Sequence, residues 1–285
     1  GIKMNWVESI NNAISYMEDH LSEEITLNDI AEAVHISAFH FQKAFTIITD
    51  MSPAEYLRKR RLSQAGIELS NGNCQVIDVA LKYGYDSPES FSKAFSRFHG
   101  VTPMQVKNGK PIRIMNRYTL RISIEGGNIL EYRIEKWDEF DLVLYIRRFE
   151  AESSEQEIRK LWKDYNEDES CVTVPSRIGA CVQRKTDGIY AEYGIGCKAS
   201  DIENVPTIFK QVHVPAYSWA VFTCVGPTES SLKDMWERIY LEWLPASDYD
   251  LLPDFYDCYI ENLPKGDPTS DDYICEICIP VIYKR

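Results

Sequence analysis

The sequence predicts two domains: an N-terminal all-α double helix–turn–helix domain, and a C-terminal α+β domain made of a duplicated β-α-β-β unit with an antiparallel sheet and two helices. Three observations support this prediction. One side-chain pattern occurs twice in the first hundred residues, at an offset of 49 to 50 positions. An order of strand and helix patterns also occurs twice after residue 130. The length of 285 residues is typical of two domains.

The first repeat keeps its apolar anchors and its turn. Asp29-Ile30-Ala31 returns as Asp78-Val79-Ala80. The remaining shared positions are Ser37, Phe41, Lys43, Ala44, Phe45 and Pro53, which return as Ser87, Phe91, Lys93, Ala94, Phe95 and Pro103. Self-similarity of this kind indicates a duplicated supersecondary unit. The unit has the pattern of a helix–turn–helix.

Local signals give the helices of the first copy. Thr26 and Asp29 have the spacing of a capping box, in which a hydroxyl and a carboxylate cap the same helix start. After a short break at His35-Ile36, Ser37 is a suitable cap for a second helix. Pro53 begins a third helix, because proline is well tolerated in a first turn.

The second copy has stronger signals. Residues 83–86 form the turn, Ser87 is the cap and Pro88 takes the first helical position. Residues 100–103 end this helix and begin a short one. The buried stripe of the helix is expected to consist of Phe91, Phe95 and Phe98. Four of the five histidines fall in this N-terminal half and are expected at the surface or in turns.

The opposite faces of these helices decide whether the bundle can read DNA. We expect the solvent faces to carry Phe39, Gln42 and Lys43 in the first copy, and Glu89, Ser90, Lys93 and Arg97 in the second. Gln, Lys and Arg side chains can meet base edges or phosphates when such a helix enters a major groove. On the linking helix, Arg60 and Arg61 belong to a basic run where phosphates would pass. The alternative is a repeated helical bundle without a DNA-binding role.

Residues 5–108 resemble the DNA-binding domain of the AraC/XylS family of bacterial transcription regulators. The resemblance rests on residues 31–53, 58–62 and 78–103, and is closest from Gly84 to Pro103. It implies that one long helix holds two recognition helices against successive major grooves, with half-sites about 10 bp apart. The implied partners are double-stranded DNA and RNA polymerase. Glu89 departs from a basic reading helix, although a carboxylate can accept from a cytosine amino group.

Charge is divided unevenly along the chain. The net charge is −13, yet residues 1–110 carry 11 Lys and Arg against 13 Asp and Glu, while residues 111–285 carry 20 against 31. We place the domain boundary in residues 108–111, giving a domain 1–110 and a domain 111–285. Eight scattered cysteines suit reduced thiols. We expect a cytoplasmic protein, with no membrane segment and no leader.

The second half repeats one order of elements. The expected elements are a strand region 131–149, a helix 155–165 and strands 178–184 and 189–196, followed by strands 210–225, a helix 231–244 and strands 255–260 and 273–283. Two such units should join into one antiparallel sheet with both helices on one face.

Residues 117–285 resemble the GyrI-like effector-binding domain, chiefly through residues 215–222, 236–245 and 275–281. The resemblance implies a cleft lined by aromatic rings and one or two carboxylates, which receives amphipathic, often cationic, small molecules. A desolvated cation gains from ring faces and from a buried acid. Glu276 matches the family's acid before the last strand, and Asp257 is a candidate for a second. Further candidates for contact with the ligand are Tyr145, Glu192, Tyr193, Tyr217, Trp219 and Trp236.

Strand alternation predicts on which face of the sheet Glu276 lies. Cys275, Ile277 and Ile279 form the more apolar set and should pack on the helices. Glu276 would then point to the open side, toward the seam between the repeats.

Other functions are less well supported. Some domains that resemble this one are hydrolases, so Glu192 or Glu276 with a tyrosine could be catalytic, and a third possibility is a domain that binds only a protein. We expect no enzyme and no cofactor, because motifs for a nucleophile, a phosphate loop or a metalloprotease are absent. Cys275 and Cys278 face opposite sides of a strand, so we expect no metal site.

Overall fold

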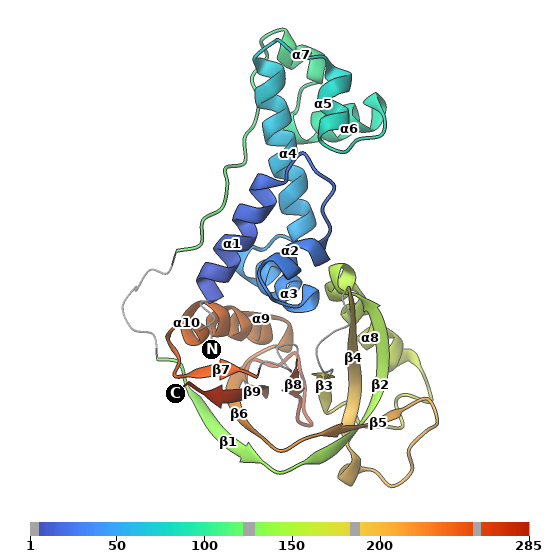
Figure 1. The fold of residues 1–285 in the computed structure, drawn as a ribbon. Helices are drawn as coiled ribbons and strands as arrows, with labels where there is room; N and C mark the ends of the chain where they lie inside the picture. The colour runs from blue at the N-terminus through green and yellow to red at the C-terminus, as the bar shows by residue number, and fades with distance from the viewer. Residues whose placement is uncertain (1–5, 122–128, 183–188, 253–257, 285) are drawn as a thin grey trace. The chain divides into compact units, whose positions relative to one another are not determined.

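The structure is a computed structural model that describes residues 6–121, 129–182, 189–252 and 258–284. The chain divides into two compact units, which we describe separately (Figure 1). The helical unit comprises residues 1–35 and 49–121, and the sheet unit comprises residues 36–48 and 122–285. The helix α3 (Ala38–Thr49) therefore belongs almost entirely to the sheet unit, although the repeat places it in the first helix–turn–helix. The domain boundary near residue 110 stays a prediction.

The helical unit is organised around one long helix, α4 (Pro53–Ser70). Its 18 residues span about 27 Å. α1 lies along the first part of α4, and α5 to α7 gather around its C-terminal end (Figure 1). The other helices of the unit are α1 (Trp6–Asp19), α2 (Leu27–Ala33), α5 (Val76–Lys82), α6 (Pro88–His99) and α7 (Pro103–Lys107).

Side chains that cap helices lie where the sequence predicts them. Thr26 and Asp29 form the capping box of α2. The Ser87 hydroxyl accepts a hydrogen bond from the Ser90 amide at the start of α6, with Pro88 in the first turn. Each cap satisfies amide groups that a helix start otherwise leaves unpaired. The predicted starts of these two helices are confirmed.

Both repeats need a left-handed residue at the same two places. In the second copy these are glycines, Gly84 (φ 84°) and Gly100 (φ 75°). In the first copy they are His35 (φ 57°) and Asp50 (φ 54°), the only non-glycine residues with positive φ in the described part of the chain. That conformation costs a residue with a side chain about 1–2 kcal/mol. The turn geometry is therefore conserved between the repeats even where glycine is not.

One histidine of the helical unit is buried, against the expectation for this residue type. His99 Nε2 donates to the Leu62 carbonyl oxygen at 2.7 Å, and its Nδ1 accepts from the Arg113 amide at 3.0 Å. Burial lowers the pKa of His99, although the bond to Leu62 opposes this. Gly66 leaves room for the ring, since a Cβ there would lie 2.6 Å from His99 Cε1. The expected surface position of His99 is wrong, because the ring fixes α6 against α4. The same expectation is wrong for His40, which is also buried.

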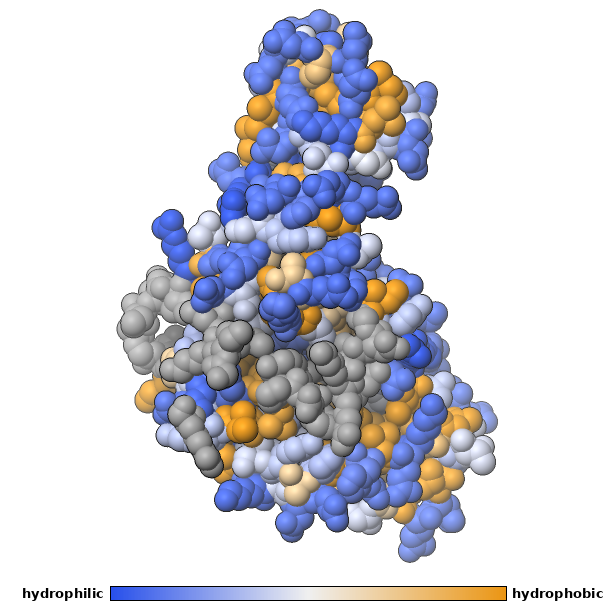
Figure 2. Space-filling model, viewed as in Figure 1, coloured by the Kyte–Doolittle hydropathy of each residue, from blue (hydrophilic) through white to orange (hydrophobic). Residues whose placement is uncertain are grey.

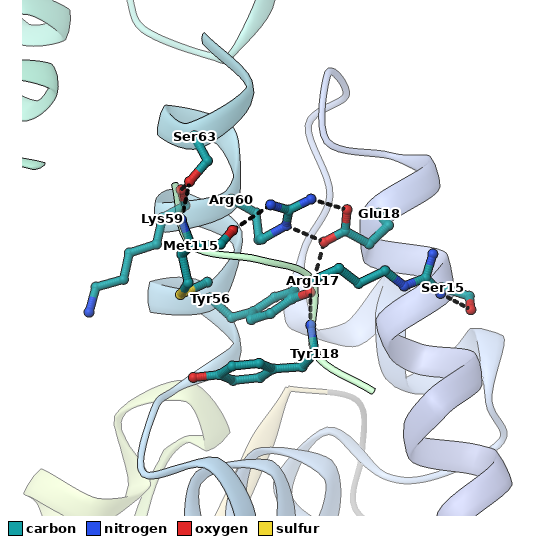
Figure 3. Close-up of polar contacts among 9 residues, drawn as sticks. All are labelled: Ser15, Glu18, Tyr56, Lys59, Arg60, Ser63, Met115, Arg117 and Tyr118. Atoms are coloured by element: carbon teal, nitrogen blue, oxygen red, sulfur yellow. Dashed lines mark hydrogen bonds and ion pairs between the residues drawn. The ribbon is translucent and has the colours of Figure 1, made fainter. Parts of the chain in front are cut away.

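The segment after α7 returns along the helical unit (Figure 3). The Met115 amide donates to Ser63 Oγ at 3.0 Å, and Arg60 Nη1 donates to the Met115 carbonyl at 2.5 Å. Further along, Asn11 exchanges two hydrogen bonds with the Leu120 backbone, at 2.8 and 2.9 Å. Residues 112–120 are thus part of the helical unit, and we call them the strap.

In the part of the chain that the structure describes, the sheet unit forms one antiparallel sheet of nine strands (Figure 1). Strand order is β1-β6-β9-β8-β3-β4-β2-β5, and β7 pairs with β9. The strands are β1 (Tyr132–Trp137), β2 (Phe140–Glu150), β3 (Ile178–Cys181), β4 (Tyr190–Lys198), β5 (Lys210–Val214), β6 (Tyr217–Val225), β7 (Tyr249–Leu251), β8 (Tyr259–Asn262) and β9 (Ile274–Tyr283). The predicted repeats are β2-α8-β3-β4 and β6-α9-β8-β9, which confirms the duplicated unit.

The two repeats meet in the middle of the sheet, and each edge strand of the sheet pairs with a strand of the other repeat. β3 pairs with β8 at the centre, where Gly179 lies opposite Glu261. At the margins, β1 of the first half pairs with β6, and β5 of the second half pairs with β2. The pairing of β3 with β8 defines the seam between the repeats.

The sheet has a core face and a helix face. The core face carries a buried cluster that includes Leu142, Trp219, Val221, Ile260 and Cys278. The helix face carries α8 (Ser154–Glu167) and α9 (Thr228–Arg238), which continues through a π-helical turn (Ile239–Trp243) into α10 (Leu244–Ala246). Both helices lie on this face, because Trp162 of α8 is close to Gly179 and Trp236 of α9 contacts Tyr259. The prediction of both helices on one face is confirmed.

The surface of the helical unit is mostly hydrophilic on the side drawn in Figure 2. Hydrophobic residues also reach the surface of this unit around α5 to α7, where Ile77, Leu81 and Met104 are exposed. None of the helices that the structure describes has the length and apolar composition needed to cross a bilayer.

Candidate functional site

A lysine side chain lies between two aromatic rings on the helix face of the sheet. Lys43 Nζ is 3.3 Å from the ring centroid of Trp236 and 3.4 Å from that of Tyr259. The two rings meet edge to face, with centroids 5.0 Å apart and planes at 78°. The Lys43 nitrogen is buried. This is the geometry in which the negative face of a ring attracts a cation.

A carboxylate lies on the same strand as one of the two rings. Glu261 lies two residues beyond Tyr259 on β8, so both side chains lie on the same face of the strand. Burial raises the pKa of Glu261, and the positive charge of Lys43 opposes the rise. We call Trp236, Tyr259 and Glu261 the cage.

Two further aromatic side chains border the cage across the seam. Trp162 Nε1 donates to Tyr193 Oη at 3.1 Å. The hydroxyl of Tyr193 lies above Gly179, where a Cβ would be only 2.0 Å from it. Burial raises the pKa of Tyr193, and the charge of Glu261 raises it further. Tyr193 therefore presents a neutral hydroxyl beside the cage.

Little space is left in the cage. The described residues enclose a cavity of about 10 Å³, which is room for roughly one water molecule. Its lining includes Phe39, His40 and Lys43 of α3 on one side, and Trp236, Ile239 and Tyr240 of α9 and the π-helical turn on the other. Side chains of α3 thus fill the space above the rings.

α3 does not present its expected reading face to solvent. Phe39 and Gln42 are 2% and 5% exposed, and Gln42 Nε2 donates to the Glu152 carbonyl at 3.1 Å. The expectation that these two residues lie on the solvent side is wrong, and Lys43 is only partly exposed. The reason is composition: α3 has apolar residues on all sides, and such a helix is buried on more than one face.

The second reading face is open. In α6, Glu89, Ser90, Lys93 and Arg97 are all exposed, whereas Phe91 and Phe95 are fully buried. This placement agrees with the sequence analysis except at Phe98, which is partly exposed instead of buried. Contact with DNA stays a prediction.

The linking helix α4 uses two of its arginines within the helical unit. Arg60 is buried and bonds both Glu18 oxygens, at 2.7 and 2.9 Å. Arg61 donates to the backbone carbonyls of residues 21 and 23. The expected phosphate contact is therefore corrected for Arg60, whose guanidinium already holds a buried carboxylate. Of the basic side chains on α4, that of Arg58 is half exposed and that of Lys59 is about a third exposed.

Two of the predicted ligand residues lie at or beside the cage, namely Trp236 and Tyr193. Three others lie elsewhere: Tyr145 packs near Tyr165 and Phe209, and Tyr217 and Trp219 pack with the core-face cluster. Glu192 is placed on β4 opposite Arg148. Asp257 lies outside the described residues.

Glu276 is not brought to the cage. It pairs with Arg133 at 2.5 Å and accepts from Asn262 Nδ2 at 3.2 Å. Its neighbours across β8 and β9 place it on the core face, opposite to Glu261. The predicted packing of Ile277 and Ile279 toward the helices is correct. The acid that accompanies the aromatic rings is Glu261, which the Tyr259-Ile260-Glu261 alternation could have indicated.

Comparisons with known proteins match both halves of the chain. A model described as "Helix-turn-helix domain" matches residues 30–109, and one described as "Integron-associated effector binding protein" matches residues 133–281. The HTH-type transcriptional activator AarP of Providencia stuartii is 39% identical over 94 residues, which are 70% of AarP and 33% of this chain. The chain belongs to the AraC family of transcription regulators. Its second half is a GyrI-like effector-binding domain.

Other AraC-type relatives and solved structures match one half or the other. The Tn10 TetD protein of Escherichia coli is 32% identical over 35% of this chain and 73% of TetD. The regulator YbfP of Bacillus subtilis (strain 168) is 31% identical over 47% of this chain, and the match spans 43% of YbfP. Among structures, SAV2435 bound to tetraphenylphosphonium is similar with a TM-score of 0.46 and 19% identity, over 54% of this chain and 94% of SAV2435.

Among the described residues, no group of three or more His, Cys, Asp or Glu side chains is arranged to hold a metal ion.

Proposed function

We propose that this AraC-family regulator binds DNA through its helix–turn–helix units and senses an organic cation in the cage of its sheet unit. The observation that carries the proposal is the ammonium group of Lys43 between the rings of Trp236 and Tyr259. A site that accommodates one cation in this way has the chemistry to accommodate another.

The physical basis favours large, weakly hydrated cations. Each ring face contributes about 0.5–2 kcal/mol to binding a cation. Burial raises the pKa of Glu261, and a cation bound beside it would favour its charged form, while the neutral Tyr193 adds no repulsion. A strongly hydrated inorganic ion would lose more by leaving water than an aromatic cation with delocalised charge. We therefore infer an aromatic or amphipathic organic cation as the effector class.

Removing the carboxylate tests this directly. For tetraphenylphosphonium, Glu261→Gln should weaken binding by about 1–3 kcal/mol, because the ligand loses an opposite charge at close range. Trp236→Ala should weaken it by about 1–2 kcal/mol through the lost ring. Tyr259→Phe is the matched control, since it keeps the ring and should keep the affinity. Isothermal titration calorimetry with the full chain measures all three.

An anion of the same shape controls for hydrophobicity. Tetraphenylborate should not share the dependence on Glu261, because its charge is repelled by the carboxylate. If Glu261→Gln left tetraphenylphosphonium affinity unchanged, or if the borate bound as well as the phosphonium, the proposed cation site would be wrong.

The exposed face of α6 supports the proposal that this helix, the second reading helix of the repeat, binds DNA. Replacing Lys93 or Arg97 by alanine should weaken binding to a preferred duplex by about 1–3 kcal/mol where the side chain reads a base edge. A phosphate contact would instead weaken binding to all sequences and lower the salt slope by about 1. Electrophoretic or fluorescence titrations at several salt concentrations distinguish these. Lys265→Ala, on an exposed loop of the sheet unit, is the control and should leave DNA affinity unchanged. Unchanged DNA affinity in both α6 variants would show that this face of α6 does not bind DNA.

We also propose that the chain has no catalytic role. The relatives named as regulators support this, and Glu276, one of the two acids considered for hydrolysis, is engaged with Arg133. Contact with RNA polymerase stays a prediction.

A further inference from the structure

We infer that α3 is an internal occupant of the cage, so that a cationic effector must displace Lys43 and thereby releases the first reading helix. The inference rests on the proposed function, since it takes the cage as the effector site. It adds the way in which effector binding and DNA reading are linked.

The same side chains of α3 are assigned to DNA reading by the repeat and to the cage by the structure. Phe39, Gln42 and Lys43 are the residues that the repeat assigns to DNA reading in the first copy. In the structure, all three are turned to the sheet unit: Phe39 and Lys43 line the cavity, and Gln42 bonds the Glu152 carbonyl. A side chain held in this way cannot also reach a base edge. Occupancy of the cage by α3 and reading by α3 are mutually exclusive.

Lys43 fits closely into the cage. Its ammonium group lies within 3.4 Å of both ring centroids, and its charge acts on Glu261. The remaining cavity of about 10 Å³ cannot admit a molecule much larger than water. An aromatic cation can enter only if Lys43 leaves, so the two cations compete for one place.

α3 spans the seam and contacts both repeats. On one side Gln42 is bonded just before α8, at Glu152. On the other side the ring of His40 meets that of Tyr240 edge to face, with centroids 5.8 Å apart. α3 is thus held from both repeats, and Lys43 is placed between these contacts. An effector that separates the helix from the rings would act on all of them together.

The internal repeat supplies a natural comparison. Lys93 occupies in α6 the position that Lys43 occupies in α3, and Lys93 is exposed. Two lysines equivalent in the repeat therefore have different surroundings, one in a cage and one in solvent. Only the first can compete with an effector.

Linkage gives the sign of the effect. If Lys43 occupies the cage in most molecules, the apparent affinity for the effector is the intrinsic affinity multiplied by the fraction of molecules with an open cage. A minor state of about 1–10% corresponds to a reduction of about 10- to 100-fold. DNA and effector both favour the state in which α3 has left the cage, so each should increase the affinity for the other by the same factor.

The experiment compares Lys43→Ala with Lys93→Ala in the full chain. By calorimetry, Lys43→Ala should bind tetraphenylphosphonium about 10- to 100-fold more tightly than the unchanged chain. Lys93→Ala should lower DNA affinity while binding the phosphonium as the unchanged chain does. In hydrogen–deuterium exchange, the phosphonium should increase exchange in residues 36–48 of the unchanged chain. It should also increase affinity for a duplex selected from a random library with the same chain.

Each failure has a separate meaning. If Lys43→Ala binds the phosphonium no more tightly and exchange in residues 36–48 does not change, the internal-occupant inference is overturned while the cation site stands. If no variant binds the phosphonium, the proposed effector class is wrong. Exchange without any ligand then still decides the inference, because Trp236→Ala should increase exchange in residues 36–48 if the cage holds α3. Should Lys43→Ala fail to fold, Lys43→Met keeps the stem without the charge and takes its place.

Discussion

Replacing Arg60 by alanine is expected to lower the free energy of unfolding by about 3–5 kcal/mol. The side chains of Arg60 and Glu18 are 7% and 10% exposed and form a two-pronged ion pair (Figure 3). Without the guanidinium, the Glu18 carboxylate stays buried without its cation. Arg60 also bonds the Met115 carbonyl, so the strap loses an anchor. Urea unfolding followed by circular dichroism measures the change.

A neighbouring ion pair provides the control for this substitution. Lys59 pairs with Glu55 at 2.9 Å, with both side chains about a third exposed. Such a surface pair contributes about 0.3–0.5 kcal/mol, so Lys59→Ala should change stability little. Equal effects of Lys59→Ala and Arg60→Ala would show that burial does not determine the strength of the Arg60 pair.

The same pair gives stability a defined pH dependence. Burial raises the pKa of Glu18, but hydrogen bonds from Arg60 and Tyr56 outweigh it and the pKa lies below its ordinary value. A carboxyl group with a lowered pKa in the folded state stabilises the fold fully above its unfolded value of about 4.3. The stabilisation is lost as the pH falls through the lower, folded-state value. The difference between the unchanged chain and Glu18→Gln should therefore be constant near pH 7 and shrink in acid.

The features that the sequence predicts correctly depend on interactions between residues that are close in the chain. The capping box at Thr26, the cap at Ser87 and the strand alternation around Ile277 involve residues a few positions apart, and the structure confirms each. The duplications were visible for the same reason, because a repeated local pattern needs no knowledge of the partner surface. These features determine the elements and the class of fold.

What the sequence did not predict depends on distant partners. Arg60 belongs to a basic run, but its role is set by Glu18, 42 positions away. α3 has the pattern of a reading helix, while its apolar residues on all sides are satisfied by the sheet unit. Glu261 was missed because the register of β8 against β3 decides which acid reaches the seam. A resemblance to a family pattern placed the acid at Glu276, on the other face of the sheet.

The second large effect is expected at the seam, where Gly179→Ala should destabilise the sheet unit by about 2–3 kcal/mol. A Cβ at this position would lie 2.0 Å from Tyr193 Oη and 3.1 Å from Trp162 Cζ2. The Tyr193 ring is fully buried, so it has no free space into which to move. The pairing of Gly179 with Glu261 means that any displacement also disturbs the cage. Affinity for tetraphenylphosphonium should therefore fall together with stability.

A double-mutant cycle separates this clash from a general loss of β-sheet stability. Tyr193→Phe removes the hydroxyl that a new Cβ would meet, at the cost of the hydrogen bond from Trp162. In that background Gly179→Ala should cost at least about 1 kcal/mol less than in the unchanged chain, since contacting residues couple by about 0.5–3 kcal/mol. Equal costs in both backgrounds would mean that the hydroxyl is not what requires glycine. A positive coupling would show that the Tyr193 hydroxyl, which belongs to the first repeat, requires glycine at position 179. Because Gly179 pairs with Glu261 of the second repeat, the position of Tyr193 would then also determine the backbone position beside this carboxylate.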